Sequence, residues 1–147
     1  MCLDRHHKSP LEVDIDAPSR TCSAIVRWAF ADERTKGAWN NEIDATEQGA
    51  YCVALVVVEL TEGLVAVRRA EKETGADYYI APINAQVEDL EGWRRLEVSG
   101  VDKGNISAVQ QRLRQKVAQA KRGKSNLPAI AAVVGFLCKR VSVQLVD

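Results

Sequence analysis

The hydrophobic pattern between residues 38 and 62 predicts a helix. Its apolar stripe recurs at helical spacing and consists of Ile43, Ala50, Ala54, Val57, Val58 and Thr61. Asp32 or the pair Asn40/Asn41 would cap its start, and Gly63 would end it. The valine-rich run Ala50–Leu60 also suits a strand. We therefore expect a helix over 38–62, with a strand as the open alternative.

After Gly63 the pattern changes to short segments typical of strands. The expected strands are Leu64–Arg68, Asp77–Ala81, Arg94–Ser99, Ala129–Leu137 and Val141–Val146, with connections at 70–76 and 83–92. A second amphipathic helix is expected over 104–122, between the third and fourth of these strands. Asn105 is its expected N-cap and Gly123 its end.

The first 37 residues have weaker signals. Residues 1–12 are polar and without periodicity, which indicates a loose lead-in. Leu11–Ile15 alternates weakly and suits an edge strand, and Ser23–Phe30 suits a helical turn or a first helix segment. From residue 38 onward the order is α-β-β-β-α-β-β. We expect a single α/β domain over 1–147, with a central mixed sheet flanked by helices.

The composition excludes several classes of protein. The 147 residues carry no net charge, which argues against a broad nucleic-acid-binding tail. The longest apolar run, Ala50–Val58, is too short to span a membrane. Four scattered cysteines form no zinc spacing, and Cys52 and Cys138 lie in apolar runs that suggest buried thiols. No signal peptide is visible, so we expect a reducing, cytoplasmic setting without membrane contact.

Two carboxylates at strand positions suggest a metal site. Asp77 begins one expected strand, and Glu97 lies about 20 residues later inside the next. Mg²⁺ takes oxygen ligands and usually only one or two protein carboxylates, so Asp77, Glu97 and the carbonyl of Val98 are candidate ligands. Such a metal activates water for attack on a phosphate. The two histidines, His6 and His7, lie in the lead-in, which disfavours a Ser/His or Cys/His nucleophile.

This element order, with Asp77 followed by Glu97-Val98-Ser99, resembles the PD-(D/E)XK nuclease superfamily over residues 40 to 146. The resemblance implies a restriction-endonuclease-like core with Mg²⁺ or Mn²⁺, acting as an endonuclease on DNA phosphodiester bonds. It also implies a setting of restriction or phage defence. In that family the acidic strand reads Glu-x-Lys, whereas Ser99 stands here in the place of the lysine.

Some members of the family carry this lysine on the following helix. Lys116 is the preferred candidate here over Lys103, because it flanks the apolar stripe of the second helix, and Gln119 shares its side. The family often adds an acidic residue from the first helix, for which Glu47 lies on the apolar arc. A carboxylate facing a core is costly unless it is paired or binds a metal.

Arg68, Arg69, Arg112 and Gln119 are candidate DNA contacts. Plainer interpretations remain open: Glu97 as an outward polar residue, Asp77 as a turn residue, and Glu47 and Lys116 as solvated helix charges. The alternative function is a non-catalytic PD-(D/E)XK-like subunit for nucleic-acid binding or protein assembly. A plain interaction module is a third possibility. Because so small a monomer has little room for sequence recognition, we expect a homodimer or a larger complex.

Overall fold

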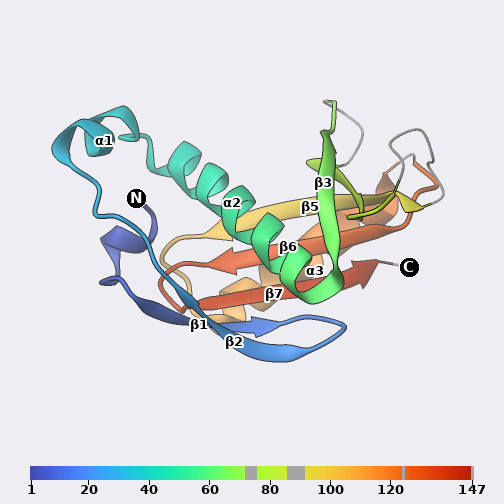
Figure 1. Ribbon diagram of the computed structural model, residues 1–147, viewed down its shortest axis with the longest axis horizontal. Helices are drawn as coiled ribbons and strands as arrows, with labels where there is room; N and C mark the ends of the chain where they lie inside the picture. Colours follow the sequence, from blue (N-terminus) through green and yellow to red (C-terminus); the bar gives the residue numbers. More distant parts are fainter. Residues whose placement is uncertain (72–75, 86–91, 124, 147) are drawn as a thin grey trace.

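A seven-stranded mixed sheet forms the centre of the molecule (Figure 1). The computed structural model describes residues 1–71, 76–85, 92–123 and 125–146. The strands are β1 (Leu11–Asp16), β2 (Thr21–Val26), β3 (Leu64–Arg69), β4 (Tyr78–Pro82), β5 (Arg94–Val101), β6 (Ala129–Gly135) and β7 (Arg140–Val146). Their order across the sheet is β2-β1-β7-β6-β5-β4-β3. Two of the pairs, β1 with β7 and β5 with β6, are parallel, and the others are antiparallel.

The helices in the described residues are α1 (Glu33–Ala38), α2 (Glu42–Glu62) and α3 (Ile106–Arg122), with a short 3₁₀ turn at Leu3–Arg5. The helical interpretation of 38–62 is therefore confirmed for α2. Its first turn is capped by Asn41, whose side-chain oxygen accepts hydrogen bonds from the backbone N–H groups of Ile43 and Asp44. It ends at Gly63, which adopts the left-handed conformation with φ of 67°.

The two long helices cover opposite faces of the sheet (Figure 1). On β6, Ile130, Ala132 and Val134 face α2 and belong to the larger core, whereas Ala129 and Ala131 face α3. This alternation follows from the two-residue period of a strand. The continuous apolar run of β6 thus reflects a central strand that is buried on both faces.

The shortness of β4 leaves part of β5 exposed at its edge. Pairing between β4 and β5 ends at Tyr78 opposite Leu96. Beyond that point β5 continues to Val101 and, among the described residues, is paired there with β6 alone. The second half of β5 therefore has a free edge between the two long helices.

The N-terminal expectations were partly wrong. Thr21–Val26 is strand β2, not the helical turn expected within Ser23–Phe30. Strand β1 is not an edge strand, because it lies between β2 and β7. Its parallel pairing with β7 joins segments more than a hundred residues apart, and no local pattern reports such pairing.

The first ten residues pack on the core and are not a loose lead-in. Cys2 is buried and its thiol donates to the Ala45 carbonyl at 2.9 Å. The His6 ring is paired with Asp102 at 2.9 Å, and Asp4 accepts hydrogen bonds from Trp28 and Ala31. Two further expectations failed, since Cys52 is exposed on α2 and Cys138 is only partly buried.

The expected connections at 70–76 and 83–92 fall partly outside the described residues, at 72–75 and 86–91. In the part of the chain that is described, no helix combines the length and the apolar character needed to cross a bilayer.

Candidate active site

Glu97 is a charged residue in the interior of the sheet. It is 1% exposed, so the plainer interpretation of Glu97 as an outward-facing polar residue is wrong. Its neighbours Leu96 and Val98 face α2, so alternation turns Glu97 toward α3. There Lys116 Nζ lies 3.1 Å from Glu97 Oε2. The burial raises the pKa of the Glu97 carboxyl, and the Lys116 ammonium acts in the opposite direction.

Asp77 closes the hydrogen-bond ladder between β4 and β5. Its backbone N–H donates to the Leu96 carbonyl at 2.8 Å, and its Oδ2 accepts the Val98 N–H at 2.7 Å. The side chain thus takes the place of the next strand residue. In a strand, the N–H and C=O of one residue point to the same side. The Val98 carbonyl therefore points to the free edge, beside the Asp77 carboxylate.

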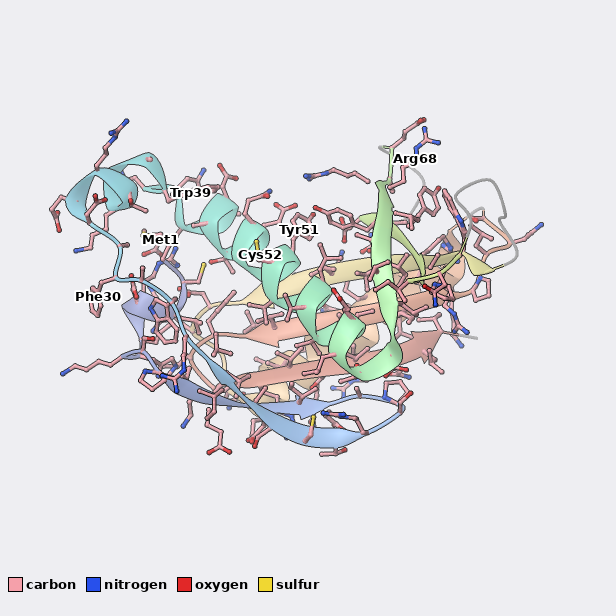
Figure 2. The ribbon with its side chains drawn as sticks, in the orientation of Figure 1. Met1, Phe30, Trp39, Tyr51, Cys52 and Arg68 are labelled. Carbon is pink, nitrogen blue, oxygen red and sulfur yellow. The ribbon has the colours of Figure 1, made fainter. Side chains whose placement is uncertain are left out.

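Tyr51 connects Asp77 to the first long helix. Its hydroxyl lies 2.6 Å from Glu47 Oε1 and 3.0 Å from Asp77 Oδ1, within hydrogen-bond distance of both. One hydroxyl donates only one proton, so one carboxylate oxygen is left without it. Burial raises the pKa of Tyr51, and the two carboxylates add to this effect. In Figure 2, Tyr51 projects from α2 toward β3.

Arg69, at the end of β3, lies over two aromatic rings. Its guanidinium carbon is 5.5 Å from the Tyr51 ring centre and 5.6 Å from that of Tyr78. Cation–π contacts at this distance hold the guanidinium without using its N–H donors. Arg69 therefore presents hydrogen-bond donors next to the Tyr51–Asp77 contact.

Several of these groups, including Tyr51, Asp77 and Lys116, line a pocket of about 590 Å³ between α2, β5 and α3. Its walls include Glu47, Tyr51, Asp77, Val98, Ser99, Arg112, Lys116 and Gln119. Glu97 lies directly behind Lys116 and is not part of the wall. Gly100 permits the close approach of α2, because a Cβ there would lie 2.8 Å from the Thr46 carbonyl oxygen.

Most of the residues singled out in the sequence meet at this pocket. The contacts above join Glu47 to Asp77 through Tyr51 and, separately, Glu97 to Lys116, and Arg112 and Gln119 lie in the wall. Neither arginine of β3 is in the wall. Arg69 lies over the Tyr51 and Tyr78 rings, and Arg68 pairs with Glu71 at 3.2 Å at the outer end of β3 (Figure 2). Lys103 lines the pocket but pairs with Glu42, not with Glu97.

Tyr51 was missed in the sequence. It follows Glu47 by four residues, so the two side chains share one face of α2. That spacing was the available signal. The contact with Asp77, 26 residues away, depends on the fold.

The donor set was compared with the needs of a metal ion. Within the described residues, no group of three or more His, Cys, Asp or Glu side chains is placed to hold one. The pocket wall instead offers the Asp77 carboxylate and Val98, and the Glu97 carboxylate lies behind Lys116. Two carboxylates fit Mg²⁺, which keeps several of its waters. The residues present are therefore compatible with a magnesium or manganese ion.

The chain was also compared with known proteins. No protein-family model, curated protein or solved structure matches it.

Proposed function

We propose that this pocket is the active site of a metal-dependent nuclease that hydrolyses DNA phosphodiester bonds. We also propose that the run from α2 to β7 forms a restriction-endonuclease-like core. Asp77, Glu97 and the Val98 carbonyl would hold Mg²⁺ or Mn²⁺. The bound metal supplies Lewis acidity, which favours ionisation of a water and offsets charge on the phosphate.

Lys116 has two roles in this proposal. Its ammonium group holds Glu97 in place, and it lies in the pocket wall where a phosphate oxygen would gain negative charge. A fixed cation at such a position stabilises a transition state without reorganisation. In the hydrolysis, the water gives up a proton to solvent as its oxygen bonds to phosphorus, the bond from phosphorus to the leaving oxygen breaks, and the leaving oxygen takes up a proton from solvent.

Glu47 and Tyr51 position Asp77. The Tyr51 hydroxyl, which lies between Glu47 and Asp77, contacts Oδ1 of Asp77, and the Val98 N–H holds Oδ2. Arg69, Arg112 and Gln119 would contact the DNA backbone around the scissile phosphate. A nuclease of this kind suits a role in restriction or phage defence.

The observation that carries the proposal is the arrival of Lys116 at Glu97 from α3. Asp77 accepts the Val98 N–H at the free edge of β5, and one residue earlier in the strand the buried Glu97 carboxylate meets Lys116 from α3. An ion pair that only stabilised the fold could lie anywhere in the core. This pair lies beside the part of β5 whose edge is free, which a substrate could reach.

The experiment is cleavage of supercoiled plasmid by the purified protein in Mg²⁺, Mn²⁺ or chelator. We expect metal-dependent nicking that is lost in Asp77→Asn and Glu97→Gln. Glu42→Gln is the matched control, since Glu42 is an exposed carboxylate of the same pocket. Equal cleavage by wild type and both site variants would show that the site is elsewhere.

A second candidate function is supported by the same ion pair. Lys116 already neutralises Glu97, and Ser99 replaces the lysine of the family motif, as in a scaffold that binds nucleic acid or a protein without cutting. The two candidates differ in outcome. A non-catalytic subunit would retain DNA with a steep salt dependence, yet leave the plasmid intact in both metals.

A further inference from the structure

An apolar surface unrelated to the pocket covers the other side of α2. Cys52, Val56 and Leu60 follow one another at four-residue spacing and all face solvent. Val56 is 65% exposed and Leu60 is 49% exposed. A helix that is apolar all round is normally buried on all sides. In this chain, nothing in the described residues covers that face of α2.

This stripe runs into an apolar hollow. The hollow has a volume of about 530 Å³ and is lined by Val26, Trp28, Trp39, Cys52, Val53 and Phe136, among others. Met1 and Leu3 form part of its wall. Figure 2 shows Met1, Trp39 and Cys52 along this side of the molecule.

A large apolar knob stands beside the hollow. Phe30 is 68% exposed, two residues after Trp28 in the hollow's wall. Its position is fixed by Asp4, which accepts hydrogen bonds from the Trp28 side chain and from the Ala31 backbone at 2.8 Å. Met1 is tied to the same carboxylate through its amino group. Phe30 is therefore held at the rim and does not fold back into its own hollow.

We propose that this surface joins two copies of the chain, with Phe30 of each copy seated in the hollow of the other. A two-fold interface needs a self-complementary patch in which a knob and its hole lie side by side, as Phe30 and the Trp28–Trp39 hollow do. The zero net charge of the chain removes long-range repulsion between copies.

The exposed area is of the right size for a dimer. An aromatic side chain offers about 150–250 Å² and an aliphatic one about 100 Å², so Phe30, Trp39, Val56 and Leu60 expose roughly 350 Å² of apolar surface. A standard interface buries about 800 Å² on each partner, of which somewhat more than half is apolar. The four side chains and the walls of the hollow together approach the apolar share of such an interface.

The test is the molar mass of the full chain in solution, by sedimentation equilibrium over a wide range of concentration. We expect the dimer mass for wild type, and the monomer mass for Phe30→Asp and for Val56→Glu. Phe30→Leu keeps an apolar knob and is expected to remain dimeric. Ile83→Asp is the control, because Ile83 is 69% exposed but lies outside this surface.

Circular dichroism of each variant checks that the fold is intact, as expected for changes at exposed positions. A wild type that is monomeric throughout would overturn the proposal. So would a dimer that survives both Phe30→Asp and Val56→Glu, or one that Ile83→Asp alone dissociates. The test does not depend on nuclease activity.

Discussion

Lys116, on helix α3, places its Nζ 3.1 Å from Oε2 of Glu97. Glu97 precedes Ser99 by two residues in β5. Glu97 and Ser99 differ by two residues and therefore project from the same face of β5, toward α3. A lysine at 99 and a lysine at 116 would approach Glu97 from neighbouring directions. The pair supplies the pocket with a cation although position 99 is a serine.

This relationship predicts that the lysine can be moved. We expect Lys116→Met to lower the rate of plasmid cleavage by about 10²- to 10⁴-fold. The double variant Ser99→Lys/Lys116→Met should recover activity to within roughly tenfold of wild type, because the cation returns to the same carboxylate. Lys103→Met is the control with unchanged activity. Full activity of Lys116→Met would refute the role given to Lys116.

The raised pKa of Glu97 predicts a pH-dependent stability. The folded protein holds a proton on Glu97 more tightly than the unfolded chain, where the ordinary pKa is 4.5. The stability that this gives is complete below pH 4.5 and is lost as the pH rises through the folded-state pKa. Glutamine carries no such titration. In metal-free buffer, the free energy of unfolding of wild type should therefore fall with rising pH relative to that of Glu97→Gln.

Urea unfolding of both proteins between about pH 4 and pH 8 provides the measurement. A difference between them that is independent of pH, or that grows in favour of wild type as the pH rises, would contradict the assignment.

Tyr51→Phe removes the proton shared by two carboxylates. In metal-free buffer we expect a loss of about 1–2 kcal/mol in the free energy of unfolding, because Asp77 and Glu47 lose their common donor. Tyr78→Phe is the matched control, since in the described residues the Tyr78 ring makes ring contacts but its hydroxyl makes no hydrogen bond. Equal losses in the two variants would mean that the effect comes from ring packing.

Gly100→Ala tests the close contact between α2 and β5. The new methyl group would lie 2.7 Å from the Thr46 Cγ2 and 2.8 Å from its carbonyl oxygen, so α2 must shift. We expect a loss of about 1–3 kcal/mol in stability. Gly37→Ala, where no atom lies within 4 Å of the new group, should have no such cost. Thermal unfolding compares the two, and similar melting temperatures would contradict the packing described.

The sequence predicted the parts of the fold that depend on local pattern. The caps Asn41 and Asn105 and the stop at Gly63 are local signals, and each is found in the structure. The predicted stripe of α2 is buried from Ala50 to Thr61, but its first member, Ile43, is 78% exposed. Strand β2 was missed because Thr21–Val26 is short, its alternating apolar residues Cys22 and Ala24 are small, and Ile25 breaks the alternation. The place of β1 in the sheet depends on its pairing with β7, which no periodicity encodes.

The candidate site was predicted to a similar degree. Asp77 and Glu97 were identified from their strand positions, and Lys116 from its place beside the stripe of its helix. The burial of Glu97 was not predictable, because the sequence around a single glutamate in a strand does not show that a helix will cover that face of the sheet. Arg68 was placed with Arg69, but neighbouring residues of a strand point to opposite faces.

The central claim is that one divalent cation lies between Asp77 and Glu97. Isothermal titration calorimetry with Mn²⁺ measures this directly, in wild type, Asp77→Asn and Glu97→Gln, with Glu42→Gln as control. The account predicts a single site in wild type and in the control, and affinity reduced by at least about tenfold in the two site variants. No binding by wild type, or equal binding by wild type and Asp77→Asn, would contradict it.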